Sequence, residues 1–432
     1  MISVRKRFSP WLWIPCLFAA EEIPSAVVVF VALLMFLQFG ADEAMASLFS
    51  GLLFLPWVLK SYFYTKVNMM KPQAFMRRIH LVELLMFACL MLIAIYLNDY
   101  RVEAWVLFLF MFVLSFLCAW HELLSRLYYN RMLTPREQRV YGNTKMIASQ
   151  VSLVMTYGLL IIVAGFFEVF FRSYQKAWAM ESSLVAGGFL VFCVLNVVVV
   201  QTFRHHGHYR RETFAGAVQH EWRVVERIRQ KPHVVKLLLS LFFLLLPQAL
   251  MFNTRVFFLL ASVDEGGLDC SVQEVGFAQG TVGVIAFSVG LGVGRFWMNR
   301  YGVRKMFWGM VTALTLSPLS YMLMSHVPQP DDLFLLCCMT FFAQILFGIG
   351  LNVCGAFVRY TSGGRYRNTI NYLYVPLVAS AMFVPMMLSG WLSTMLGYSC
   401  FFSVCVAMAP VSWVIVKLCG MKKILTIYEN NQ

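Results

Sequence analysis

Near its amino terminus the chain reads PWLWIPCLFAAEEIPSAVVVFVALLMFLQF from Pro10 to Phe39, an apolar run whose only charged residues are Glu21 and Glu22. A helix of about 20 apolar residues crosses the hydrocarbon core of a bilayer. The run is long enough to do so, and the two acids lie roughly a dozen residues into it, well inside the core. It therefore predicts a membrane-spanning helix with charge at bilayer depth.

Apolar runs of this kind recur along the 432 residues, of which 60% are apolar and only 13% are charged. A soluble domain carries about 25% charged residues because its surface must face water. The surplus apolar surface here needs lipid as its solvent. The composition thus predicts an all-α membrane protein with twelve transmembrane helices. The predicted spans lie near 10–39, 45–65, 80–97, 104–128, 145–171, 183–203, 236–262, 273–297, 306–326, 333–357, 369–395 and 400–418.

One connecting segment is much longer than the others. It runs from Arg204 to His233 and is polar and basic. It separates six spans from six, which is typical of two pseudo-symmetric six-helix halves joined by a cytoplasmic linker. We expect an amino-terminal half at 1–203, the linker at 204–235 and a carboxy-terminal half at 236–432.

The formal net charge of +14 raises the alternative of a nucleic-acid partner. The basic residues, however, cluster in alternate short loops and form no continuous face for a phosphate backbone. Such alternation follows the positive-inside rule and predicts a multi-pass protein of the cytoplasmic (inner) membrane with both termini in the cytoplasm. The basic loops hold Arg5, Lys6 and Arg7; Lys66, Lys71, Arg77 and Arg78; Arg131, Arg136 and Arg139; the linker; Arg300, Arg304 and Lys305; Arg359, Arg365 and Arg367; and Lys422 and Lys423.

Charged and amide side chains inside the spans are the candidate functional residues, because charge is expensive within a bilayer. Apart from Lys60 on the second span, the main candidates lie on the first, fourth, seventh and tenth spans. Glu83 and Glu168 are nearer span ends, which favours an interfacial position. The candidates are Glu21, Glu22, Lys60, His121, Glu122, Arg126, Asn253, Arg255, Gln344 and Asn352.

Four of these residues can carry a proton. Glu21 and Glu22 are adjacent, so both cannot remain charged cheaply, and successive helix positions point in different directions. We expect one of them to face the interior, where desolvation favours the protonated carboxyl. His121 and Glu122 offer a second protonation site near neutral pH.

The remaining candidates are expected to bind substrate. Arg255 is the best placed to hold an anionic group, because guanidinium pairs with carboxylate or phosphate. Two alternatives stay open: Glu122 and Arg126, at i and i+4, can form a structural ion pair, and Lys60 can extend to the headgroups or bridge helices. The substrate-binding candidates are Lys60, Arg126, Asn253, Arg255, Gln344 and Asn352.

Other function classes find little support in the sequence. Nearly all of the eleven cysteines lie in apolar runs without metal-ligand spacing, which favours reduced packing residues. The cluster of His205, His206 and His208 admits a metal site, but its basic loop lacks carboxylates and favours a solvated linker. No nucleophile elbow, phosphate-binding glycine loop or metalloprotease motif is present. We therefore expect neither enzyme activity nor a metal or other cofactor.

A family resemblance begins in the loop after the eighth span, which reads NRYGVRK from Asn299 to Lys305. It resembles the D-R-x-G-R-R/K loop motif of the major facilitator superfamily, with an asparagine in place of the acid. In that family the motif links helices and stabilises one conformation. The resemblance implies this conformational role for Asn299, Arg300, Gly302, Arg304 and Lys305, and a major facilitator fold for the chain.

Further stretches resemble the AmpG-type muropeptide permeases and their peptide–acetyl-CoA transporter relatives. The chain departs from them where it has Glu122 followed by Arg126 instead of two acids, and Glu21 and Glu22 instead of small residues; the W-x-P-x-x-D ending of the second helix is missing. The similar stretches are Leu55–Lys60, Ala119–Glu122, Leu133–Glu137, Gly276–Gly283, Asn368–Tyr372, Ser389–Leu392 and Leu396–Tyr398.

This resemblance implies a secondary transporter, a symporter that imports a bulky polar or anionic solute such as a muropeptide with protons. A monomer in the lipid bilayer is the default state for such a fold. The alternatives are a different cargo, such as a siderophore or an acyl-CoA-like nucleotide, or a non-transporting membrane receptor or assembly factor that keeps the fold.

Overall fold

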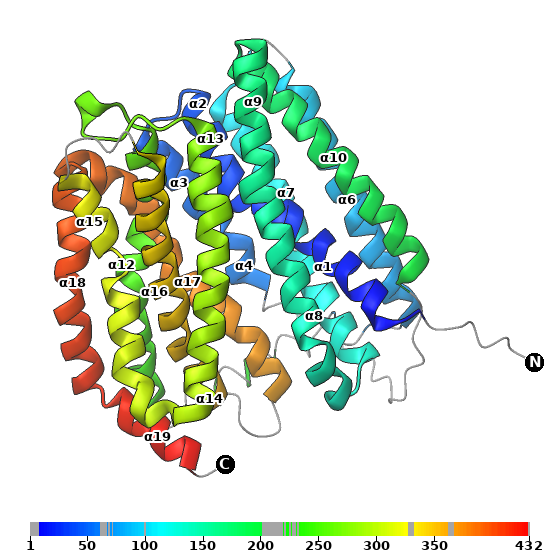
Figure 1. Cartoon of the computed structure of the whole chain (residues 1–432). Helices are drawn as coiled ribbons and strands as arrows, with labels where there is room; N and C mark the ends of the chain where they lie inside the picture. The colour runs from blue at the N-terminus through cyan, green and yellow to red at the C-terminus, as the bar shows by residue number, and fades with distance from the viewer. Residues whose placement is uncertain are drawn as a thin grey trace, which may run out of the picture. The chain divides into compact units, whose positions relative to one another are not determined.

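The computed structural model describes residues 8–60, 67, 70, 72–98, 101–200, 219, 222–223, 226, 230, 233–326, 332–361 and 367–430. Every regular element in these residues is a helix (Figure 1). Most of the predicted linker at 204–235, including His205, His206 and His208, lies outside them. So do the side chains of the Asn368–Tyr372 stretch.

The predicted spans correspond to the helices that the structure describes. Ten of these are long and apolar enough to cross a membrane, and a shorter apolar helix at Glu43–Leu59 matches the predicted second span. One continuous run, Val272–His326, covers both the eighth and the ninth. The prediction of a twelve-span all-α membrane protein is thereby confirmed. The ten are Pro10–Gln38, Ala74–Leu97, Ala104–Met132, Pro135–Phe171, Tyr174–Val199, Val234–Leu260, Val272–His326, Leu333–Phe357, Ala379–Leu396 and Tyr398–Leu418.

The long run contains the turn between the two spans at a single residue. Helix α14 extends over Gly283–Leu316, and Gly302 within it adopts φ 76° and ψ 163°. This region of backbone space is essentially restricted to glycine. The glycine of the predicted loop motif is therefore the residue at which the chain leaves one span and enters the next.

The described residues form two compact units, and the first comprises 1–39 and 62–218. Its helices α1 and α10 each pack against several others, and π-helical segments interrupt the predicted first and fifth spans. Pro15 and Pro24 lie inside α1, shortly before the first π-helical segment. The elements are α1 Pro10–Ala26, η1 Val27–Val31, α2 Ala32–Gln38, α6 Pro72–Leu97, α7 Ala104–Met132, α8 Pro135–Leu153, η3 Val154–Leu160, α9 Ile161–Phe171 and α10 Tyr174–Val199.

The second unit comprises 40–61 and 219–432. Its α14 and α16 run side by side, and a Cβ placed at Gly290 or Gly348 would strike the backbone of the facing helix (Figure 1). Small residues allow this close approach. The elements are α3 Glu43–Leu53, α4 Leu55–Leu59, α12 Val234–Leu260, η4 Val263–Glu265, α13 Val272–Val275, η5 Gly276–Val282, α14 Gly283–Leu316, α15 Leu319–His326, α16 Leu333–Thr361, α17 Arg367–Leu396, α18 Tyr398–Leu418 and α19 Met421–Asn430.

The predicted second span clusters with the second unit, although its chain order places it in the first predicted half. Helix α3 packs along α17, where a Cβ at Gly390 would strike the backbone of Glu43. The Glu43 carboxylate accepts hydrogen bonds from Ser393 Oγ (2.9 Å) and from the Tyr398 hydroxyl. These contacts explain why residues 40–61 cluster with the second unit. The half boundaries at 1–203 and 236–432 stay a prediction.

Large apolar side chains remain on the surface of the first unit. Ile95 on α6 is 62% exposed, and Val169 and Phe170 on α9 are 73% and 70% exposed. Water would disfavour so many exposed apolar groups on helices that already satisfy their own backbone hydrogen bonds. These faces are suited to contact with lipid chains.

Two spans begin with the same local device. Thr134 at the start of α8 and Ser271 at the start of α13 each form a capping box with the glutamate three residues later, Glu137 and Glu274. In both, the hydroxyl accepts from the glutamate N–H and the carboxylate accepts from the cap residue N–H. The Leu133–Glu137 stretch of the resemblance thus contains the sequence that starts the fifth helix.

Candidate functional site

The first unit contains a buried ion-pair group that joins α1 to α7. Arg126 Nη2 lies 2.6 Å from Glu122 Oε1, and Arg126 Nε lies 3.6 Å from Glu21 Oε1. The side chains of Glu21 and Glu122 are 4% and 7% exposed, whereas that of Arg126 is 33% exposed. The predicted pairing of Glu122 with Arg126 is present, and Glu21 joins it from another helix.

Two further charged residues surround this group. Glu22 is within electrostatic range of Glu122 and Arg126. Lys145 on α8 is within range of all three carboxylates, and its Nζ lies 4.4 Å from the centre of the Phe18 ring. We name Glu21, Glu22, Glu122, Arg126 and Lys145 the charged cluster. If every member is ionised, it holds three negative and two positive charges.

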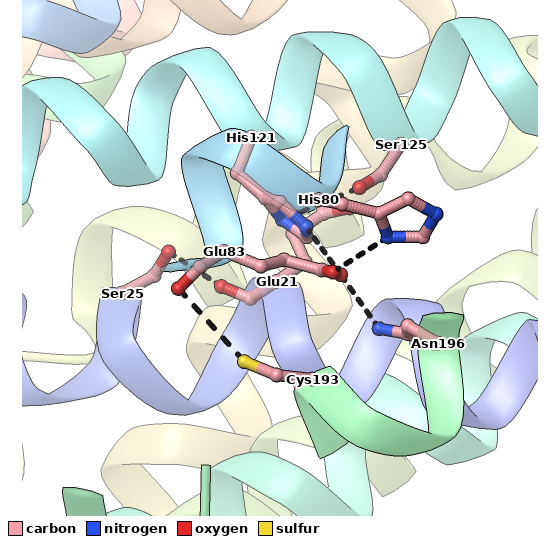
Figure 2. A network of polar contacts seen from close by, with 8 residues as sticks. All are labelled: Glu21, Ser25, His80, Glu83, His121, Ser125, Cys193 and Asn196. Atoms are coloured by element: carbon pink, nitrogen blue, oxygen red, sulfur yellow. Dashed lines mark hydrogen bonds and ion pairs between the residues drawn. The ribbon is translucent and has the colours of Figure 1, made fainter. Parts of the chain in front are cut away.

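A second polar group lies around Glu83, a residue of α6 that is 1% exposed (Figure 2). Its Oε1 is 3.2 Å from His121 Nε2 and accepts from Asn196 Nδ2 at 2.7 Å, while its Oε2 is 3.3 Å from His80 Nδ1. Ser125 Oγ is 3.3 Å from His121 Nδ1. We name these five residues the Glu83 hub; it links α6, α7 and α10.

Donors and acceptors can be assigned consistently to all hydrogen bonds of the Glu83 hub. A carboxylate can only accept, so an ionised Glu83 requires an N–H on each imidazole nitrogen that faces it. His121 then carries its proton on Nε2 and can accept from Ser125 at Nδ1. Such charge-assisted hydrogen bonds are stronger than neutral ones. The hub therefore ties three helices together within a site from which water is largely excluded.

His121 and Glu122 are neighbours in sequence but belong to different groups. Successive residues of a helix point about 100° apart, and the two side chains accordingly contact Glu83 and Arg126, respectively. Glu83, for which an interfacial position was expected, is almost completely buried within the protein. Glu168 is half-buried and accepts from Gln38 Nε2 at 3.3 Å.

Several buried polar residues are not among the predicted ones, mostly because the helices begin earlier than the apolar runs. Lys145 opens the predicted fifth span, yet α8 already begins at Pro135. Glu181 precedes the predicted sixth span but is completely buried in α10, which begins at Tyr174. Asn196 stands out as an amide within an apolar span, and that signal alone could have found it.

The two candidate asparagines of the second unit bond to neighbouring helices. Asn253 on α12 accepts from Ser50 Oγ at 3.0 Å and donates to the Met386 carbonyl at 3.5 Å. Asn352 on α16 donates to the Leu291 carbonyl of α14 at 3.4 Å and to carbonyls of its own helix. Both arrangements hold helices together.

The other candidates of the second unit differ in their surroundings. Arg255 is half-buried, with its guanidinium carbon 5.0 Å from the centre of the Phe252 ring. Lys60 ends α4 and is 6% exposed, and Gln344 on α16 is 7% exposed. The predicted residues fall in both units: those of the charged cluster belong to the first, and these belong to the second.

The loop-motif residues lie around the Gly302 turn in α14. Arg300 is 5.9 Å from the Tyr301 ring centre, and Arg304 lines a surface groove. Asn299 and Lys305 are exposed. Within the residues that the structure describes, no three side chains of His, Cys, Asp or Glu are grouped as metal ligands.

No known family model matches the sequence, and no curated protein matches it. The structure, in contrast, is similar to solved transporters. A nucleoside transporter, NupG, is 12% identical with a TM-score of 0.65, and the alignment covers 96% of this chain and 99% of NupG. A bacterial homologue of the human lysosomal transporter Spinster is 13% identical with a TM-score of 0.67, with coverage of 97% and 95%.

A third similar structure comes from work on proton-dependent oligopeptide transporters. It is 12% identical with a TM-score of 0.70, and the alignment covers 96% of this chain and 99% of the other. At such identities the likeness shows the fold alone. The chain therefore has the twelve-helix fold of these solved transporters.

Proposed function

We propose that the protein is a secondary active transporter that couples the entry of a solute to the entry of protons. The proposal rests on the burial of the Glu21 carboxylate in the charged cluster. Its Oε2 is buried and has no hydrogen-bond partner among the described residues. A buried carboxylate oxygen without a donor is costly, and protonation removes that cost.

The distances favour Glu21 over Glu122 as the proton carrier. Arg126 approaches Glu122 to 2.6 Å but Glu21 only to 3.6 Å. Glu22 is less buried than Glu21, so water can offset part of the cost of its charge. One proton on Glu21 would balance the two remaining carboxylates against Arg126 and Lys145. Proton binding then loosens the link between α1 and α7 that Arg126 provides.

The proposed cargo is a bulky polar or anionic solute, muropeptide-like by the sequence resemblance. Arg255, with Lys60 and Gln344, is the proposed contribution of the second unit, and its guanidinium suits a carboxylate or phosphate. We further propose import across the inner membrane by a monomer with cytoplasmic termini. Siderophores and acyl-CoA-like nucleotides are the rival cargoes, and a non-transporting receptor or assembly factor is the rival class.

A binding panel on the purified chain can distinguish the cargoes before any transport measurement. Anhydromuropeptide, acyl-CoA and siderophore are each added during thermal unfolding. A ligand present at about 100 times its dissociation constant adds about 2.7 kcal/mol to stability. We expect the muropeptide to stabilise the protein. A response to another class alone would overturn the cargo and leave the transporter proposal standing.

Proteoliposomes with the ligand found in that panel then test proton coupling. Under an inward proton gradient the wild-type chain should accumulate the ligand against its concentration gradient. Glu21→Gln should abolish accumulation but retain exchange at equal concentrations, because exchange needs no net proton movement. Glu22→Gln is the matched control and should still accumulate. Unchanged accumulation by Glu21→Gln, or equal loss in both variants, would show that Glu21 is not the carrier.

A further inference from the structure

A surface groove of about 540 Å³ lies in the second unit, where α18 ends and α19 begins. Four cationic residues line it: Arg304 from α14, Lys417 from the end of α18, and Lys422 and Lys423 from α19. We name this groove, with Trp308 and Val416 as its apolar wall, the basic groove. None of the proposed transport chemistry uses it.

The cations of the basic groove are held by packed structure. Helix α19 follows α18 after a turn at Gly420, where φ is 67°. Its Met421 and Leu425 are 0% and 2% exposed and belong to a core cluster that includes Val303 and Phe307 of α14. The two lysines of α19 therefore have defined positions beside Arg304, and the groove is a built feature of the bundle.

The four cations lack a compensating anion within the described part of the chain. No carboxylate there forms an ion pair with Arg304, Lys417, Lys422 or Lys423. Like charges that converge on one groove repel one another, and an anion that enters it relieves the repulsion. The charge pattern thus indicates a ligand with one or more negative charges.

The position of the groove indicates where that anion comes from. Lys417 and Leu418 are at the end of the membrane-spanning helix α18, and Leu418 is 79% exposed. A span end is at headgroup depth, where basic side chains attract anionic lipids. A free phosphate ion would match the cations but leave Trp308 and the exposed Leu418 surface without an apolar partner.

We propose that the basic groove binds the phosphate group of an anionic phospholipid, whose acyl chains lie along α18 beside Leu418. Arg304 and the three lysines contact the headgroup, and Trp308 contacts the first apolar atoms below it. Binding fixes α19 and the segment after Gly302 to one lipid. Apart from Arg304, which also belongs to the loop motif, the site shares no residue with the proposed transport function and is tested without it.

The full-length protein in a neutral detergent is titrated with phosphatidylglycerol, phosphatidylcholine and inorganic phosphate, and bound lipid is counted by native mass spectrometry. The test variant is Lys422→Gln with Lys423→Gln. The matched control is Arg136→Gln with Arg139→Gln, which removes two exposed cations from α8 and so changes the net charge equally. We expect phosphatidylglycerol to bind the wild type and the control alike, and the test variant at least about tenfold more weakly.

Three outcomes would overturn the proposal. Equal phosphatidylglycerol affinity in the test variant and the wild type would remove the basic groove from binding. Equal affinity for phosphatidylcholine and phosphatidylglycerol would mean that the charge of the headgroup does not determine binding. Displacement of phosphatidylglycerol by inorganic phosphate at equal concentration would assign the site to the free anion and not to a lipid. The unfolding temperature of the test variant verifies that it is folded. If the test variant does not fold, Arg304→Gln replaces it in the experiment.

Discussion

Within each of the two units, different kinds of contact hold the helices together. In the first unit, α1 and α7 meet through Glu21, Arg126 and Glu122, and α6, α7 and α10 meet through Glu83. In the second unit, α12, α14, α16 and α17 meet through asparagine hydrogen bonds to backbone and through glycine contacts. The first interior therefore contains a cluster of buried ionisable groups, whereas these asparagine and glycine contacts of the second are uncharged.

The difference has a consequence for function. A carboxylate and a guanidinium in a water-poor site change their mutual attraction when one proton binds. An amide bound to a backbone carbonyl, or a glycine against a facing helix, does not respond to protons. The proposed proton response thus belongs to the charged cluster of the first unit. Three predictions test this contrast.

Arg126→Ala should have the largest effect on stability. It leaves Glu21 and Glu122 buried without their shared cation, and breaking a buried ion pair costs about 3–5 kcal/mol. Since the Arg126 side chain is 33% exposed, we expect about 3 kcal/mol at pH 7. The loss should shrink at low pH, where protonated carboxyls need no cation. Unfolding in mixed detergent at both pH values measures it.

Arg126→Lys is the matched control because it retains the charge but loses the planar fork. We expect it to recover most of the stability at pH 7, since the Glu122 contact needs one cation within reach. A loss for Arg126→Ala that is the same at both pH values would mean that the residue acts by packing. The contrast between the two interiors would then fail.

Gly290→Leu tests the packed interior of the second unit. Its side chain would strike the Ile345 carbonyl of α16 and force α14 away, at a cost of about 1–3 kcal/mol. No dependence on pH is expected, because no ionisable group is involved. Gly292→Leu, two residues along the same helix, has open space around its Cβ and should be nearly neutral. Thermal unfolding of both variants provides the comparison, and an equal loss in both would contradict close packing at Gly290.

The sequence predicted the spans well because the hydrophobic signal is additive over about 20 residues. The run from Pro10 to Phe39 and the helix Pro10–Gln38 differ by one residue. Helices that extend past the apolar window were cut short, as at α8, where the polar stretch before Lys145 is helical. Helicity outside the bilayer depends on caps such as Thr134, which hydropathy does not register.

The candidate site was predicted in part. The residue types on the first and fourth spans identified Glu21, Glu122 and Arg126, because charge inside an apolar run is visible in sequence. The partner of His121 was not predictable, since Glu83 and Asn196 come from spans whose rotation about their axes is set by packing. For Asn253 and Asn352, the sequence did not reveal the hydrogen bonds that their amides donate to backbone carbonyls of neighbouring helices.

The smallest effect distinguishes two histidines on the same carboxylate. His121 is 0% exposed and His80 is 24% exposed, and they lie 3.2 and 3.3 Å from Glu83. His121→Ala leaves a buried carboxylate with one fewer donor and should cost about 1–2 kcal/mol. His80→Ala should cost less than about 1 kcal/mol, because water can replace a half-exposed donor. Equal losses by thermal unfolding would show that burial does not set the strength of the hub, and that proximity to Glu83 is sufficient.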